Sequence, residues 1–172
     1  MRVLPVPEQG RTGFTELSPA ETRLAFTNSL EELASAGNRV LENGSGVAIG
    51  DYDRDGRPDV FLCGLFAPSR LFRNLGPEGF EAANVPAEID LAGEIARGAA
   101  FADVNGDGWL DLLVTTLNGG VRCLINQQNG RFADRTEAAG LRSDLGCTTL
   151  ALADVDGNGS LDLYVANNRS ED

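Results

Sequence analysis

Three short acidic segments hold the side chains of this sequence that are best suited to chemistry. Each has an oxygen-bearing side chain at relative positions 1, 3, 5 and 9 and a glycine at position 6. The side chains at positions 1, 3, 5 and 9 are Asp51, Asp53, Asp55 and Asp59 in the first segment, Asp103, Asn105, Asp107 and Asp111 in the second, and Asp154, Asp156, Asn158 and Asp162 in the third. Position 7 has no common side chain (Arg57, Trp109, Ser160), as we expect if it contributes its backbone carbonyl.

This spacing predicts a calcium site in each segment. Calcium takes about six to eight oxygen ligands at roughly 2.3–2.6 Å, and alternate residues of a tightly wound loop can supply them. Glycine at position 6 permits the positive φ that curls such a loop. Two carboxylates about 4 Å apart repel by roughly 4 kcal/mol at an effective dielectric of 20, so three or four together are expected to need a cation. We therefore predict three Ca²⁺ sites, each completed by water. Magnesium suits them less, because it demands a small octahedral site.

Two other interpretations of the segments are weaker. Aspartate and glycine are common in solvated turns, but three copies in register disfavour a plain turn. An EF-hand would have a bidentate glutamate at position 12, where this sequence has Leu62, Val114 and Val165, and it would have flanking helices.

An internal repeat places these segments. The leading aspartates Asp51, Asp103 and Asp154 are 52 and then 51 residues apart. Short apolar runs at 47–49 and 60–63 flank the first segment, and runs at 71–72 and 121–125 predict a third strand per unit, followed by a short fourth around Phe80 or Phe132. Four short antiparallel strands per roughly 50 residues is typical of a β-propeller blade. The predicted fold class is thus all-β, with about three blades.

We divide the chain into a lead-in segment at 1–45, repeat 1 at 46–97, repeat 2 at 98–148 and an incomplete repeat 3 at 149–172. In the lead-in, Ser29 and Glu32 form a capping box that predicts a short helix ending near Gly37. Residues 13–17 and 23–27 are candidate strands on either side of a turn at Ser18.

Composition excludes several functions. The net charge is −12, which disfavours nucleic acid and anionic lipid as partners. Histidine is absent, which removes His-dependent nucleophiles and His-ligated zinc or iron. No signal peptide is visible at the amino terminus, and no run approaches the roughly 20 apolar residues of a membrane span. The free cysteines Cys63, Cys123 and Cys147 are expected to be small buried side chains.

The acidic segment between two apolar strands, preceded by Gly-x-Ala-x-x-Asp, resembles the FG-GAP (VCBS) repeat. The runs 70–74 (Arg-Leu-Phe-Arg-Asn) and Gly79-Phe80 are similar to the cartilage-acidic-protein group that carries ASPIC/UnbV domains. The resemblance covers about 46–172 and implies a seven-bladed propeller with calcium in loops on one face. About three blades cannot close that ring, and the ASPIC/UnbV tail is not found in the sequence. We expect a piece of a larger propeller; the alternative is that residues 1–45 complete the third unit.

Three functions remain open. The first is a non-enzymatic module that holds structural calcium and presents a surface to a protein or glycan, outside the cell or in the cell envelope (periplasm), where calcium is plentiful. The second is a propeller-type hydrolase or lyase, although Glu78, Glu81, Glu88, Asp90 and Glu94 show no pairing pattern. The third is a calcium sensor, which would need a bistable element that rigid hairpins do not supply.

Overall fold

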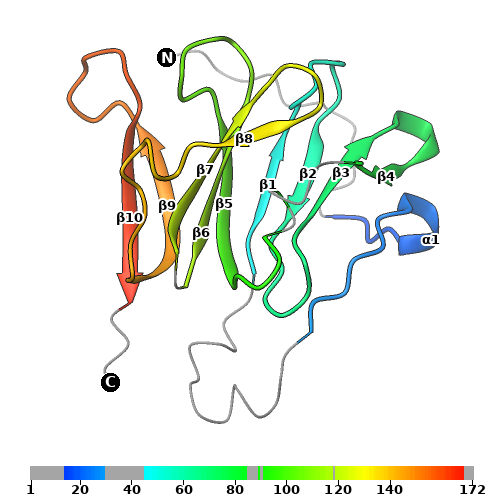
Figure 1. Cartoon of the computed structure of the whole chain (residues 1–172). Coiled ribbons are helices and arrows are strands. Elements are labelled where there is room, and N and C mark those ends of the chain that lie inside the picture. The colour runs from blue at the N-terminus through cyan, green and yellow to red at the C-terminus, as the bar shows by residue number, and fades with distance from the viewer. Residues whose placement is uncertain (1–13, 30–44, 85–88, 90, 118, 169–172) are drawn as a thin grey trace.

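Three antiparallel β-sheets stand side by side in the computed structural model, which describes residues 14–29, 45–84, 89, 91–117 and 119–168 (Figure 1). The first sheet has the order β1-β2-β3-β4 and the second the order β5-β6-β7-β8, while the third pairs β10 with β9. Each sheet is a meander, in which neighbours in the sequence are neighbours in the sheet. The all-β prediction and the four short strands per unit are confirmed for the first two units.

The strand boundaries follow the predicted apolar runs closely. The strands are β1 (Val47–Gly50), β2 (Asp59–Leu62), β3 (Arg70–Asn74), β4 (Phe80–Ala82), β5 (Ala96–Ala102), β6 (Asp111–Thr116), β7 (Gly120–Asn126), β8 (Phe132–Asp134), β9 (Gly146–Ala153) and β10 (Asp162–Asn168). A 3-10 turn (η2, Gly76–Glu78) joins β3 to β4.

The first strand of each sheet lies against the first strand of the next, so that β1 contacts β5 and β5 contacts β9. Glycine makes this close approach possible. A Cβ added at Gly46, just before β1, would lie 2.6 Å from the carbonyl oxygen of Arg97 at the start of β5. The sheets are therefore arranged as blades about a common axis, with β1, β5 and β9 innermost.

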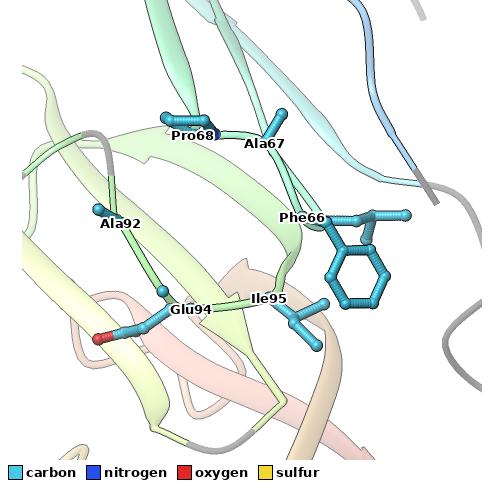
Figure 2. A pocket seen from close by; sticks show the side chains of 8 residues that line it. Phe66, Ala67, Pro68, Ala92, Glu94 and Ile95 are labelled. Carbon is cyan, nitrogen blue, oxygen red and sulfur yellow. The ribbon is translucent and has the colours of Figure 1, made fainter. Parts of the chain in front are cut away.

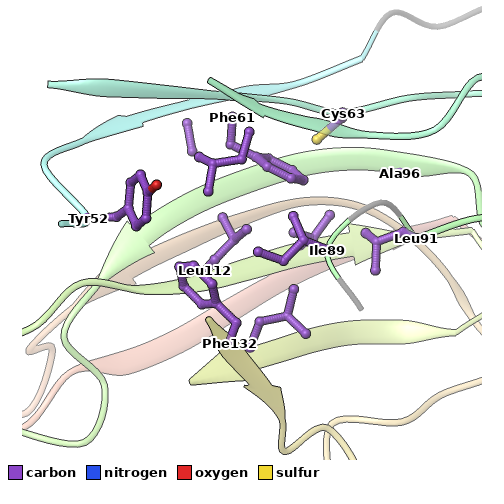
Figure 3. Packing of buried hydrophobic residues seen from close by; sticks show 12 residues of the cluster. Tyr52, Phe61, Cys63, Ile89, Leu91, Ala96, Leu112 and Phe132 are labelled. Carbon is purple, nitrogen blue, oxygen red and sulfur yellow. The ribbon is translucent and has the colours of Figure 1, made fainter. Parts of the chain in front are cut away.

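A shared hydrophobic core joins the first two sheets (Figure 3). Phe61 of β2 packs in one cluster with Leu112 of β6, Leu124 of β7 and Ile89 from the segment between the sheets, all of them fully buried. A second cluster, built on Leu113, Val121, Cys123 and Cys147, lies between the second and third sheets. The middle sheet thus packs on both faces, which explains why all six residues of β6 are buried.

The three cysteines are free and buried, as predicted. No helix in the described ranges is long and apolar enough to cross a membrane.

The described part of the lead-in segment differs from the prediction. Residues 14–17 and 23–27 form no strand; instead Ser18 begins the short helix α1 (Pro19–Thr22). The reason is a capping box that the sequence analysis overlooked, in which Ser18 and Glu21 cap each other's backbone amides. The helix predicted from Ser29 to Gly37 lies outside the described residues. The described part of the lead-in, 14–29, adds no strand to the sheet of β9 and β10.

Candidate metal centre

The three acidic segments form the loops that join β1 to β2, β5 to β6 and β9 to β10, and we call them loops 1, 2 and 3. Each lies between the two innermost strands of its sheet. All three are found at the same end of the molecule, the top in Figure 1. The three acidic segments thus occupy equivalent positions in the three sheets.

One set of hydrogen bonds, donated by backbone amides to side-chain oxygens, closes all three loops. The carboxylate at position 1 accepts from the amides of positions 5 and 6, and the side-chain oxygen at position 3 accepts from the amide of position 5. For position 1 to position 5 the distances are 3.0 Å from Asp51 to Asp55, 3.1 Å from Asp103 to Asp107 and 3.0 Å from Asp154 to Asn158. The side chain at position 5 accepts from the amide of position 7 in each loop. The polar side chains at positions 1, 3 and 5 are therefore turned inward.

The backbone curls as the glycine pattern predicts. At position 6, φ is +86° for Gly56, +85° for Gly108 and +87° for Gly159. Position 4 is also left-handed in every loop, with glycine in loops 2 and 3 but with Arg54 at +59° in loop 1. A left-handed conformation costs a non-glycine residue roughly 1–2 kcal/mol, so the loop shape is maintained in loop 1 even against this cost.

Acidic oxygens converge in this geometry. In loop 1, Asp51, Asp53 and Asp59 offer carboxylate oxygens that all lie within 4.8 Å of one another, and in loop 3 Asp154, Asp156 and Asp162 do the same. Two oxygens on opposite sides of one calcium ion are about 5 Å apart at most, given Ca–O distances near 2.5 Å. The spacing of these donors and their hard-oxygen chemistry fit calcium. In loop 2, position 3 is Asn105, whose oxygen makes the same bond to position 5 as Asp53 does.

The aspartate at position 9 anchors each loop at its base. Asp59 accepts from the amides of Tyr52 at 3.1 Å and Asn74 at 2.8 Å, and Asp111 accepts from Val104 at 3.0 Å and Asn126 at 2.8 Å. Both carboxylates are fully buried. These residues tie the loop to the third strand of the sheet as well as facing the other acids.

Burial raises the pKa of Asp59 from 3.8 to about 6, and burial raises the pKa of Asp111 as well. Because the folded chain then binds a proton more readily than the unfolded one, Asp59 stabilises the fold most below pH 4. That contribution, on the order of 3 kcal/mol at most, is lost as the pH rises through about 6.

We therefore expect that, in EDTA, Asp59→Asn reduces the fall in unfolding free energy between pH 4 and pH 6.5. The difference between the two proteins is the quantity to measure, by urea unfolding, because hydrogen bonds lower the pKa of Asp107 and Asp134 and give the opposite slope. Parallel pH profiles for the two proteins would contradict the assignment.

Contacts between repeats fix loop 1 against repeat 2. The side-chain amide of Asn126 donates to the carbonyl of Tyr52 at 2.9 Å, and the ring of Tyr52 packs on Phe132 with the centroids 5.9 Å apart. Arg54 stacks over Trp109 of loop 2 at 5.3 Å. Asn74 and Asn126, at the ends of β3 and β7, each accept a turn amide through the side-chain oxygen. The bond from Asn126 to Tyr52 spans 74 residues and had no signal in the sequence.

Arginine side chains contact loop 1 in a way that the sequence analysis missed. Arg73, on β3, pairs with Asp53 and Asp55, and Arg57 pairs with Asp55. The pairing with Asp53 raises the pKa of Arg73. The guanidinium of Arg73 thus lies beside two of the acidic side chains of loop 1, Asp53 and Asp55.

A cleft of about 250 Å³ lies apart from the loops, between the β2–β3 connection and the segment before β5 (Figure 2). Its lining is mostly apolar: Leu65, Phe66, Ala67, Pro68, Ala92, Gly93, Glu94 and Ile95. Among the described residues of this lining, Glu94 is the one ionisable group, and it pairs with Arg122 at 3.2 Å. The described lining therefore does not bring together the paired carboxylates of a glycosidase-type site.

Fold and loops together define a class, that of modules built from four-stranded antiparallel blades with an acidic loop between the first two strands. Comparison with known proteins gives the family. The model for the FG-GAP-like repeat matches residues 51–114 and again 103–165. This chain belongs to the FG-GAP-like repeat family.

Curated relatives support the more specific resemblance. The chain is 29% identical over 138 residues to cartilage acidic protein 1 of Xenopus tropicalis, and 29% identical over 136 residues to cartilage acidic protein 1 of Homo sapiens. Each match covers 78% of this chain and 21% of the relative. The chain thus spans about a fifth of the length of the curated relatives that it matches.

Proposed function

We propose that this chain is a non-enzymatic repeat module that holds structural calcium in loops 1, 2 and 3. The observation that carries the proposal is the threefold recurrence of inward-turned side-chain oxygens with the same hydrogen bonds to loop amides. They recur although loop 1 differs from loops 2 and 3 at positions 2, 4 and 8, and all three loops differ at position 7. Positions 1, 3, 5 and 9 would supply side-chain ligands, and position 7 its carbonyl. The bound ion would neutralise carboxylates that otherwise repel one another.

Calcium in this proposal is structural rather than regulatory. The loops join hydrogen-bonded strands whose bases are anchored by buried carboxylates, so a helix pair that opens on binding, as in a sensor, has no counterpart among the described residues. Weak extracellular calcium modules have Kd values of about 10⁻⁴ to 10⁻³ M, which favours a location outside the cell or in the cell envelope. The partner would be a protein or a glycan on the surface of the blades.

The position-2 residues support a larger propeller. Tyr52 is buried because Phe132 and Asn126 of the following repeat cover it. Val104 and Val155 hold the same position in loops 2 and 3 but are 37% and 81% exposed. In a larger ring, the third and fourth strands of the third blade would cover Val104 and those of a further blade would cover Val155, as β7 and β8 of repeat 2 cover Tyr52.

A hydrolase or lyase is the second candidate, and Asp59 is the observation in its favour, because its raised pKa is typical of a general acid. However, Asp59 is fully buried, and its two oxygens accept backbone amides at the base of loop 1. A substrate has no access to it in this arrangement. The proposal of a non-enzymatic module is therefore preferred.

Thermal unfolding in EDTA, in millimolar calcium and in millimolar magnesium tests the calcium proposal. We expect calcium to raise the Tm by several degrees and magnesium to raise it less. At ten times its Kd, each bound ion adds about 1.4 kcal/mol, or roughly 3–6 °C for a chain of this size.

Asp103→Ala should lose the part of this rise that loop 2 contributes, whereas Asp144→Ala removes the same charge from an exposed site outside the loops and should keep the full rise. An equal effect of calcium and magnesium, or an unchanged calcium effect in Asp103→Ala, would count against structural calcium in loop 2.

A further inference from the structure

The three loops have the same backbone conformation. They differ in the charge next to the carboxylate oxygens that accept no loop amide, which we call the outer oxygens. In loop 1, Asp53 and Asp55 each use one oxygen for a loop amide and turn the other toward arginine. Arg73 bridges the two carboxylates, with Nε on Asp53 and Nη2 3.0 Å from Asp55. Arg57 adds a second guanidinium on Asp55.

Neutral amides take that place in loops 2 and 3. The outer oxygen of Asp107 accepts from Asn105 at 3.1 Å and from Gln128 at 3.3 Å. In loop 3 the outer oxygen of Asp156 accepts from Asn158 at 2.9 Å. Neither contact neutralises a carboxylate.

The pKa of Asp107 is lowered, mainly by the backbone hydrogen bond from Trp109 and in part by the charge of Arg54, which stacks over that indole. Among the described residues, however, Arg54 makes no ion pair with loop 2 comparable to those of Arg73 in loop 1.

The register of the repeats shows that the difference lies in single residues. Asn74 and Asn126 hold equivalent positions. The backbone amide of each donates to the position-9 aspartate of its own loop at 2.8 Å. Counting back one residue, Arg73 of β3 corresponds to Ile125 of β7, which carries no charge. Arg57 corresponds likewise to Trp109 and Ser160.

A guanidinium in this place supplies the positive charge that a divalent cation would bring. Its planar fork suits two carboxylates at once, and the two arginines form a network rather than an isolated surface pair. A cation entering loop 1 must displace Arg73 from both carboxylates, whereas in loops 2 and 3 it displaces only amide hydrogen bonds. The same pairing holds loop 1 closed when no cation is bound.

We propose that Arg73 is a built-in counter-ion that closes loop 1 in place of a divalent cation, so that calcium fills loops 2 and 3 first and loop 1 only at higher concentration. This inference rests on the proposed calcium binding of the loops. It assigns Arg73 as the residue that weakens loop 1, although loop 1 has four carboxylates at positions 1, 3, 5 and 9 where loops 2 and 3 have three.

Calorimetric titration with calcium of the whole chain, of Arg73→Ile and of Arg70→Ile tests the proposal. Arg73→Ile introduces the residue found at the same position of β7. Arg70→Ile is the matched control, because it removes the same charge from the same strand, at an exposed position that makes none of the ion pairs of loop 1 given above. We expect the unmodified chain to show two tighter sites and one weaker site, and Arg73→Ile to tighten the weaker one about tenfold.

Arg73→Lys keeps the charge but loses the fork, so it should give an intermediate affinity. Thermal unfolding gives a second readout: Arg73→Ile should lower the Tm in EDTA more than Arg70→Ile does, and saturating calcium should restore it. This comparison remains informative if Arg73→Ile folds only with calcium.

The outcomes separate the two proposals. Three equal sites, with Arg73→Ile and Arg70→Ile indistinguishable, would overturn the role of Arg73 and leave calcium binding intact. Absence of calcium binding in every variant would overturn the proposed function itself.

Discussion

Replacing Asp111 with alanine should lower the free energy of unfolding in EDTA by about 2–4 kcal/mol, because two backbone amides lose their acceptor. Asp111 is fully buried at the base of loop 2, where it accepts from Val104 at 3.0 Å and from Asn126 at 2.8 Å. The second of these bonds joins the loop to β7. For a chain of this size the change corresponds to a fall in Tm of roughly 4–15 °C, measured by circular dichroism.

Asp162 provides the control, because it holds the same position in loop 3. It accepts from the amide of Val155 at 2.9 Å and is only partly buried. Asp162→Ala should therefore cost less than about 1 kcal/mol in EDTA. Equal losses for Asp111→Ala and Asp162→Ala would show that the anchoring bonds to the third strand do not stabilise the hairpin.

Phe61→Ala should be the most destabilising of the substitutions considered, at about 3–5 kcal/mol, since it removes a large side chain from a packed core. Phe61 is fully buried on β2 and belongs to the cluster that joins the first two sheets (Figure 3). The expected fall in Tm is roughly 6–20 °C. Because the cluster is shared, we also expect the two sheets to unfold in one transition, by both far-ultraviolet and near-ultraviolet circular dichroism.

Ile49→Ala is the comparison for this prediction. Ile49 is also an apolar strand residue of the first sheet, on β1, but it is 66% exposed. A change within about 0.5 kcal/mol is expected there. Two separate transitions in the unmodified chain, one for each sheet, would mean that the sheets do not share a core in solution.

Local patterns explain why the loops and most strands could be predicted from the sequence. The aspartate spacing recurs three times, and the backbone bonds that close each loop reach no further than five residues. The left-handed φ of Gly56, Gly108 and Gly159 follows from glycine itself. The short apolar runs between turns then located β1, β2, β3 and β7 closely.

Contacts between distant parts of the chain could not be predicted in the same way. In the sequence, Arg73 looks like one more exposed arginine of a short strand, and only the pairing of β2 with β3 brings it to Asp53. The bond from Asn126 to Tyr52 depends on how one repeat packs on the next. The error at residues 14–27 had a different cause, because the capping box of Ser18 and Glu21 was visible in the sequence and was interpreted only as a turn.

Terbium luminescence tests the central claim, that the acidic loops bind calcium, most directly. Terbium is a hard cation that occupies calcium sites, and it emits when a nearby indole transfers energy to it. Trp109 is the single tryptophan of the chain and lies at position 7 of loop 2, beside the proposed ligands Asp103 and Asp107. Excitation of this indole therefore reports a cation in loop 2, and Asp103→Ala distinguishes it from a cation in loop 1, whose Arg54 stacks on the same ring.

The account predicts terbium emission that saturates on titration, is abolished by excess calcium but not by the same concentration of magnesium, and is missing in Asp103→Ala. A lack of emission from the folded chain, or equal displacement by magnesium and calcium, would contradict it. The loops would then be acidic turns that share the shape of calcium sites without their function.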